Sequence, residues 1–385
     1  MEESRRVKLL IQPGDGVLPL VKGIARAKKS VEIVIFRFDQ REIERALANA
    51  VSRGVSVSAL IAHTNRAGEE SLRRLEMRLL AAGVTVARTA DDLVRYHAKY
   101  MILDRRELFL LAFNLTLLDI ERSRSFGIIT RNRSLVAEAG KLFDADTQRH
   151  PYESGLESLV VSPVNARKRL AALIKSAKKE MLIYDLKISD QAMIHLLEDR
   201  AKAGVKIRVI GRLTRKIDGA TVRKLPTTRL HTRTMLVDGR TAFIGSQSLR
   251  EIELDARREV GIIFTDRTIV NRLTKVFEED WASTEDSSGA VDDKPVAKVA
   301  KKVAKAVTRE MAIAMPTLNG AVKDAAGDKS ALELNAEEVQ DIVKVAVKEA
   351  VSDALRNVVQ EAAEKNRHEE DKGKDKDKDK GGATA

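Results

Sequence analysis

Hydrophobic and polar residues follow the same succession twice along the chain. Residues 27–55 read AKKSVEIVIFRFDQREIERALANAVSRGV, and residues 177–205 read AKKEMLIYDLKISDQAMIHLLEDRAKAGV. In each segment a helix ends at Ala-Lys-Lys, an apolar run suited to a strand follows, and an amphipathic helix ends at a Gly-Val step. This repeat predicts two βαβ units, with Gly54 and Gly204 at the positive-φ position that ends a helix.

Matching strands are predicted in the two halves. Corresponding positions are 150 residues apart in the first section of each half and 134 residues apart in the later section. Gly68–Gly83, with leucines at helical spacing, is predicted to be the added helix that explains the difference. The predicted strands of the first half are Val31–Phe38, Val55–Ala62, Arg95–Leu103, Leu108–Phe113 and Phe126–Thr130. Those of the second half are Met181–Ile188, Val205–Gly211, Leu230–Val237, Thr241–Gly245 and Val260–Phe264.

We therefore predict an α/β fold with two similar domains, each a mixed β-sheet flanked by helices. The first domain is expected at residues 1–150 and the second at residues 151–284. Residues 285–385 differ in composition and are expected to form a linker, helices and a low-complexity tail.

Within that last segment, Pro295–Met311 reads as a helix rich in lysine and alanine. It could lie on an anionic membrane, follow nucleic acid or simply stay in solution. The apolar stripe Val339–Val359, on a helix expected over residues 335–360, is typical of a surface for self-association or docking. The run Asp371–Lys380 cannot bury a core and is predicted to be disordered.

Charge narrows the choice of partners. Residues 1–284 hold 51 of the 69 Lys and Arg residues and 36 of the 57 Asp and Glu residues, a net charge of +15. An excess of this size favours anionic partners such as nucleic acid or acidic lipid headgroups. The chain has no cysteine, which excludes disulfides, thiolate metal sites and a cysteine nucleophile. Without a recognisable signal peptide or an apolar run of membrane-spanning length, the expected location is the cytoplasm, and peripheral membrane contact stays open.

One short motif recurs at corresponding places in the two halves. Its copies are His97-Ala-Lys99-Tyr-Met-Ile-Leu-Asp104 and His231-Thr-Arg233-Thr-Met-Leu-Val-Asp238. On a strand, alternate side chains share a face, so the histidine and the cation of each copy are expected side by side, with the aspartate at the end of the strand. Two such half-sites facing each other would surround one phosphate with two imidazoles and two cations.

These residues can break a phosphodiester bond without a metal or another cofactor. One neutral imidazole attacks phosphorus to form a phosphohistidine, and the other, protonated, gives its proton to the leaving oxygen. The cations stabilise charge on the non-bridging oxygens, and an aspartate can orient an imidazole. Water or an alcohol then resolves the intermediate. The motif chemistry is nearly symmetric and leaves open which imidazole attacks.

The duplicated motif resembles the signature of the phospholipase D superfamily, His-x-Lys-x4-Asp, and the resemblance covers roughly residues 7–284. That family includes phospholipases, phosphatidyltransferases such as cardiolipin synthases, and metal-independent nucleases. The resemblance implies that His97 is the nucleophile and His231 the acid, and that Lys99, Asp104, Arg233 and Asp238 complete the catalytic set.

The chain departs from the family pattern in several places. Arg233 stands where the family has lysine. The family's Gly-Ser-x-Asn segment reads Leu111-Ala-Phe-Asn114 in the first half and Gly245-Ser-Gln-Ser248 in the second. The resemblance implies that Asn114 and Ser246 join Lys99 and Arg233 in binding phosphate, and that Ser248 supports them. Glu259 matches a family acid that orients the opposite histidine, but its counterpart in the first half is Ser125.

Three classes of function stay open from the sequence. The first is a hydrolase or transferase that acts on a phospholipid or another phosphodiester. The second is a nuclease, which the basic residues 1–284 favour. The third is a phosphate- or polyanion-binding module with weakened catalysis, which Arg233 and the incomplete Gly-Ser-x-Asn segments suggest.

Overall fold

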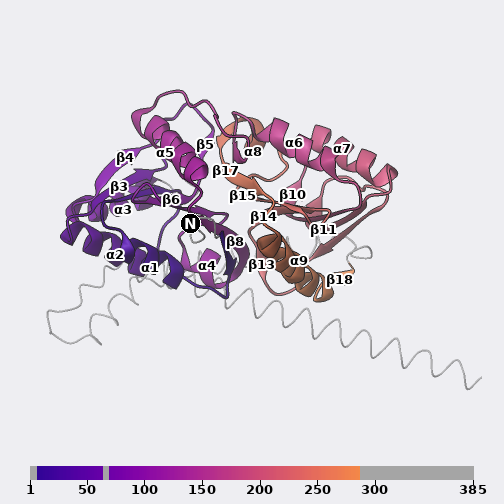
Figure 1. Ribbon diagram of the computed structural model, residues 1–385, viewed down its shortest axis with the longest axis horizontal. Coiled ribbons are helices and arrows are strands. Elements are labelled where there is room, and N and C mark those ends of the chain that lie inside the picture. The colour runs from indigo at the N-terminus through magenta and orange to yellow at the C-terminus, as the bar shows by residue number, and fades with distance from the viewer. Residues whose placement is uncertain (1–6, 64–68, 287–385) are drawn as a thin grey trace, which may run out of the picture. The chain divides into compact units, whose positions relative to one another are not determined.

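The computed structural model describes residues 7–63 and 69–286, which form two halves with the same succession of elements (Figure 1). The first half consists of β1 (Lys8–Gln12), α1 (Leu18–Arg26), β2 (Ser30–Ile35), α2 (Arg41–Ser52), β3 (Ser56–Ile61), α3 (Glu69–Ala81), β4 (Thr85–Arg88), β5 (Arg95–Tyr96), β6 (Tyr100–Leu103), β7 (Glu107–Leu111), α4 (Leu117–Glu121), β8 (Ser123–Thr130) and α5 (Arg133–Gln148).

The second half repeats this order without a counterpart of α3, with two strands in the place of β8 and with a further short strand at its end. It consists of β9 (Leu159–Val161), α6 (Ala166–Ser176), β10 (Glu180–Ile188), α7 (Gln191–Lys202), β11 (Lys206–Leu213), β12 (Ala220–Lys224), β13 (Arg229–Leu230), β14 (Arg233–Val237), β15 (Thr241–Gly245), α8 (Glu251–Asp255), β16 (Arg257–Arg258), β17 (Val260–Phe264), α9 (Arg267–Ala282) and β18 (Glu285–Asp286). The predicted added helix is α3.

Each half is built on a mixed sheet, and the two sheets have matching strand orders. The first runs β1-β8-β7-β6-β2-β3-β4, and the second runs β9-β17-β15-β14-β10-β11-β12 with β18 at its edge. The pairs β2·β3 and β3·β4 are parallel, as are β10·β11 and β11·β12, whereas the remaining pairs in the two series are antiparallel. The predicted α/β fold with two similar mixed sheets is confirmed.

Helices cover both faces of each sheet because successive strand residues point to opposite sides. Val31 and Ile33 of β2 pack with Leu47 of α2 in an outer core, whereas Val34 belongs to a second core. That second core contains side chains from both sheets and from α5 and α9, while α6 and α7 cover the other face of the second sheet. The shared core holds the two halves together along their seam.

Each motif segment changes its pairing partner at the histidine. Before His97, β5 pairs in parallel with β16 of the other half, and before His231, β13 pairs in parallel with β8 of the other half. After the motif histidines, β6 and β14 run in their own sheets. The continuous strands predicted over Arg95–Leu103 and Leu230–Val237 are therefore wrong, because each segment leaves one sheet and enters another at the motif.

This exchange places both histidines at the seam by equivalent backbone bonds. The amide of His97 donates to the carbonyl of Arg258 at 2.7 Å, and the amide of His231 donates to the carbonyl of Arg124 at 3.0 Å. Each arginine is held in turn by a buried carboxylate, Asp146 for Arg258 and Asp280 for Arg124. The chain thus repeats the support of its histidines as well as their motif.

Several further predictions can be compared with the structure. The glycines that end α2 and α7 have φ values of +80° at Gly54 and +86° at Gly204, as predicted. No helix in the described part of the chain has the length and apolar character needed to cross a bilayer. The predicted helices at 295–311 and 335–360 and the disordered tail lie outside the described residues. The proposed domain boundaries at residues 150 and 284 stay predictions.

Candidate active site

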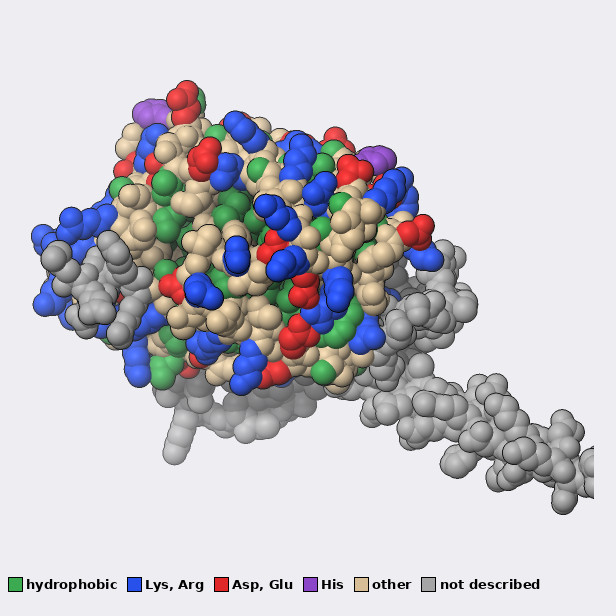
Figure 2. Space-filling model, turned by 45° about the vertical axis from the view of Figure 1, so that its right-hand side comes forward, with side chains coloured by type: hydrophobic (Ala, Val, Ile, Leu, Met, Phe, Trp, Pro, Cys, Tyr) green, Lys and Arg blue, Asp and Glu red, His purple; other side chains and the backbone are tan. Residues whose placement is uncertain are grey.

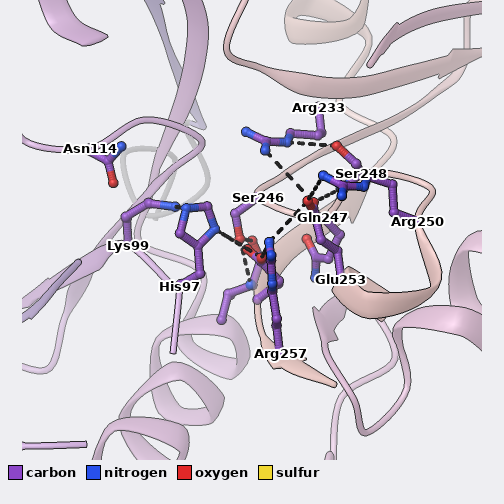
Figure 3. Close-up of polar contacts among 12 residues, drawn as sticks. His97, Lys99, Asn114, Arg233, Ser246, Gln247, Ser248, Arg250, Glu253 and Arg257 are labelled. Atoms are coloured by element: carbon purple, nitrogen blue, oxygen red, sulfur yellow. Dashed lines mark hydrogen bonds and ion pairs between the residues drawn. The ribbon is translucent and has the colours of Figure 1, made fainter. Parts of the chain in front are cut away.

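His97 lies between Glu259 of the other half and Lys99 of its own motif, and Figure 3 shows His97 and Lys99 side by side. Its Nδ1 is 2.7 Å from Oε2 and 3.0 Å from Oε1 of Glu259, and its Nε2 is 2.8 Å from Nζ of Lys99. Phe36 packs edge-on against the imidazole, with ring centroids 4.4 Å apart. A carboxylate can only accept, so Nδ1 carries the proton and Nε2 presents its lone pair.

Burial sets the protonation of this group of residues. Burial, with help from Lys99 and Arg233, lowers the pKa of His97 well below its usual range. Burial also lowers the pKa of Lys99 to about 7, although Glu259 opposes the shift. The pKa of Glu259 is raised by its own burial, which Lys99 and Arg233 partly offset. At neutral pH His97 is therefore neutral, and Nε2 is available as a nucleophile.

The second motif is built differently around its histidine. Nε2 of His231 lies 3.5 Å from Oδ2 of Asp119, and among the described residues its buried Nδ1 has no hydrogen-bond partner. Burial lowers the pKa of His231 well below its usual range, Arg233 adds to the shift, and Asp119 opposes it. Arg233 donates to the carbonyl of His231 at 2.9 Å and to the hydroxyl of Ser248 at 3.1 Å.

Two buried carboxylates that the sequence reasoning missed occupy equivalent places in the halves. Asp119 lies on α4 and accepts from the backbone amide of Asn114 at 2.9 Å, and Glu253 lies on α8 and accepts from the amide of Ser248 at 2.8 Å. Both are nearly inaccessible, with 2% and 1% of their surface exposed. The signal that could have revealed them is an acid five residues after Asn114 and again five residues after Ser248.

Asp119 and Glu253 differ in their side-chain partners. Asp119 faces groups of the first motif's phosphate set, since its Oδ2 accepts from Nδ2 of Asn114 at 2.6 Å and its charge raises the pKa of buried Lys99. Glu253 accepts only from arginines among its side-chain donors, Arg250 at 3.1 Å and Arg257 at 3.2 Å, and lies 3.9 Å from Arg233.

The motif aspartates have partners outside this group of residues, and their catalytic role stays a prediction. Asp104 accepts from the backbone amides of Lys28, Lys29 and Ser30, and Asp238 accepts equivalently from residues 178–180. Both have a φ of 53° at the turn that follows the strand. These carboxylates fasten the loop before β2 or β10.

The predicted phosphate ligands are all buried near the motifs, but several already have partners. The hydroxyl of Ser246 accepts from the backbone amide of Val260 at 3.1 Å, and Ser248 accepts from Arg233. The amide oxygen of Asn114 has no hydrogen-bond partner among the described residues. Across residues 7–63 and 69–286, no three His, Asp or Glu side chains are grouped so that they could hold a metal ion.

Comparison with known proteins places these motifs in a wider set. A family described as "Cardiolipin synthase, PLD-like domain" matches residues 20–147 and 170–281, which include both motifs. Polyphosphate kinase 1 of Chlorobaculum tepidum is 28% identical over 225 residues, which are 53% of this chain and 32% of that protein. The chain therefore spans about a third of the length of this curated relative.

Solved structures share the fold at lower identity. The polyphosphate kinase of Porphyromonas gingivalis superposes with a TM-score of 0.61 at 20% identity, over 72% of this chain and 50% of that one. The phosphatidylserine synthase of Haemophilus influenzae Rd KW20 superposes with a TM-score of 0.58 at 12% identity, over 81% of this chain and 95% of that one. The fold is thus shared with a kinase and with a synthase.

Proposed function

The chain belongs to the family of PLD-like domains described for cardiolipin synthase, and from this premise we propose that it is an enzyme that breaks or exchanges a phosphodiester bond through a phosphohistidine on His97. The similar proteins named above are kinases and a synthase that act on phosphorus compounds, which supports an enzyme in general terms. A phospholipid is the first substrate class, and the cytoplasm, with peripheral membrane contact, is the proposed location.

One observation carries this proposal, the alignment of Glu259, His97 and Lys99. Glu259 fixes the proton of His97 on Nδ1 at 2.7 Å, so that Nε2 carries the lone pair that can attack phosphorus. Lys99 lies 2.8 Å from that atom and can pass from it to a non-bridging phosphate oxygen. Only 10% of the His97 side chain is exposed, so these charges act in a medium that water hardly enters.

The proposed reaction has two steps. Nε2 of neutral His97 attacks phosphorus, the bond to the leaving oxygen breaks, and protonated His231 gives that oxygen a proton. Negative charge on the bound phosphate favours protonated His231, against the burial that lowers its pKa. Neutral His231 then takes the proton of water or an alcohol, whose oxygen attacks phosphorus and breaks the bond to His97. Lys99 and Arg233 stabilise the phosphate oxygens in both steps.

A nuclease is the second candidate, and the net charge of +15 over residues 1–284 favours it. On the face shown in Figure 2, however, Lys and Arg side chains are scattered among acidic ones and do not form a single stripe along which a nucleic acid backbone could run. The family model, which is described for cardiolipin synthase, supports placing the phospholipid class first. A binding module without turnover is the third class.

The proposal is tested with bis(p-nitrophenyl) phosphate in the presence of EDTA. We expect turnover in the wild type, its loss in His97→Ala and His231→Ala, and no change in His195→Ala, a control whose side chain is 62% exposed on α7. Phosphohistidine hydrolyses in acid and would be lost during acidic mass analysis. The adduct is therefore trapped at alkaline pH and located by peptide mapping. An adduct on His231 in place of His97 would overturn the assignment of the nucleophile.

The natural substrate is sought with the same variants. Phosphatidylglycerol with glycerol or a second lipid as acceptor, single-stranded DNA and inorganic polyphosphate represent the lipid, nucleic acid and polyphosphate classes. Turnover of one class that is abolished by His97→Ala identifies it. Binding of a polyanion without turnover of any substrate, including the nitrophenyl ester, would favour the binding module and contradict the proposed enzyme.

A further inference from the structure

The two histidines have unequal support across the seam. Glu259 follows Arg258, whose carbonyl accepts from the amide of His97, and Ser125 follows Arg124, whose carbonyl accepts from the amide of His231. Ser125 therefore occupies the place of Glu259 in the other half. Its side chain is fully buried, and its hydroxyl has no hydrogen-bond partner among the described residues. Nδ1 of His231 lacks one too, so Ser125 does not supply the contact that Glu259 makes.

Another carboxylate does face His231. Oδ2 of Asp119 is 3.5 Å from Nε2 of His231, and this contact also crosses the seam, because α4 belongs to the first half. Asp119 is itself fixed from several sides. Its Oδ2 accepts from Asn114, and its Oδ1 accepts from Arg229 at 2.5 Å. Its backbone amide donates to the hydroxyl of the capping residue Thr116 at 3.3 Å.

We infer that Asp119 is the positioning residue of the acid histidine, and that it supports the imidazolium form of His231 in place of the acid that Ser125 does not provide. This inference rests on the proposed function, in which His231 is the proton donor. At 3.5 Å the contact is longer than an ordinary N–H···O bond, so the proton on Nε2 can still pass to a leaving oxygen. Asp119 thus acts through its charge and does not take the proton itself.

The electrostatics around His231 agree with this role. The charged groups that face His231 are Asp119 on α4, Arg233 on β14, Arg229 on β13 and Lys99 before β6. Only Asp119 favours protonation, against burial and the three cations. The same coupling acts on Asp119, whose burial would raise its pKa but whose attraction to His231 and Arg229 outweighs that and lowers the pKa. Asp119 is therefore ionised when His231 is protonated.

The test compares Asp119→Asn with Glu253→Gln, the equivalent change in the other half, where the side-chain partners are arginines that do not titrate. Turnover is measured on two aryl phosphodiesters, one with a p-nitrophenyl leaving group and one with an unsubstituted phenyl leaving group. A phenolate of higher pKa needs a proton more, and general acids contribute about 10²- to 10⁴-fold. We expect Asp119→Asn to slow the phenyl ester at least about 30-fold more than the nitrophenyl ester. Glu253→Gln should slow both esters equally, and Asp119→Glu should recover most of the difference.

A second readout does not depend on turnover. In protein with ¹³C-labelled histidine, with the His231 signal assigned by its loss in His231→Gln, we expect Asp119→Asn to lower the titration midpoint of His231 by about 1 to 3 units. Glu253→Gln should leave that midpoint in place. An unchanged midpoint, or an equal slowing of both esters by Asp119→Asn, would overturn the inference. If the wild type turned over neither ester, the proposed function would fail while the midpoint still decided the role of Asp119.

Discussion

The contact between Glu259 and His97 allows the loss of kcat in Glu259 variants to be predicted from the structure. Glu259 is fully buried, and both of its oxygens lie within 3.0 Å of Nδ1. Glu259→Gln keeps the shape of the side chain, removes its charge and turns one acceptor into an N–H donor. A hydrogen bond to a charged group is worth about 1.5–3 kcal/mol, which corresponds to a rate loss of roughly 10- to 150-fold.

The amide adds a second effect, because it can donate to Nδ1 and so move the imidazole proton to Nε2, the atom that must attack. Where an amide replaces the carboxylate that orients a catalytic imidazole, the loss reaches about 10⁴-fold. Glu259→Ala loses the charge but cannot hold the wrong tautomer. We therefore expect kcat to fall roughly 10²- to 10⁴-fold in Glu259→Gln and by a smaller factor in Glu259→Ala.

The assay is the release of p-nitrophenolate from the diester, with single-turnover measurements that report formation of the His97 adduct. Thermal unfolding of both variants is the control, since Glu259 also faces Lys99 in a buried site. If kcat in folded Glu259→Gln stayed within about threefold of the wild type, the orienting role of Glu259 would be refuted. A Gln variant faster than the Ala variant would refute the argument from the tautomer.

Three further predictions concern binding and stability. Sulfate keeps its charge from pH 6 to 9, so its affinity, measured by calorimetry, should fall up to about tenfold per pH unit as the pH rises above the Lys99 pKa of about 7. Lys99→Arg should remove this fall. Equal slopes of affinity against pH in the wild type and Lys99→Arg would contradict the prediction. Asp104→Ala should lower the unfolding free energy by about 1–2 kcal/mol at pH 7 with kcat nearly unchanged. Burial would raise the pKa of Asp104, but the backbone amides outweigh it and lower the pKa, so the carboxylate stabilises the fold at a pH above its unfolded pKa. The difference in unfolding free energy between wild type and Asp104→Ala should therefore shrink below about pH 4. A difference that persisted there would exclude the charge as its cause. Gly204→Ala should cost about 1–2 kcal/mol in denaturant unfolding because φ is +86°, whereas the control Gly14→Ala should cost less.

Much of the fold could be predicted because the chain repeats, so that the elements assigned in one half can be compared with those of the other. Thr241–Gly245 and Val260–Phe264 have the predicted bounds, and α3 fills the predicted insertion. The motif strands could not be predicted correctly from periodicity. An apolar alternation shows that a segment is extended and buried, but it does not show that the segment pairs with β16 before His97 and with β2 after it. Such a change of partner depends on the other half of the chain.

The site was predictable where residue type and position suffice, and less so where distance matters. His97, Lys99 and Glu259 meet as the motif and the family pattern imply. The role of Asp104 and Asp238 was implied by the family resemblance alone, and the backbone amides that each of them binds belong to a loop distant in sequence.

The asymmetry of the site gives a physical reason for assigning the two histidines different roles. A nucleophile needs an unprotonated nitrogen and its other nitrogen held, which Glu259 provides for His97. A general acid needs negative charge near its proton but a proton that can leave, and the 3.5 Å contact between Asp119 and His231 meets both needs. Serine at position 125 is therefore compatible with catalysis. With the support of His231 on Asp119, an exchange of roles between the two histidines is unfavourable.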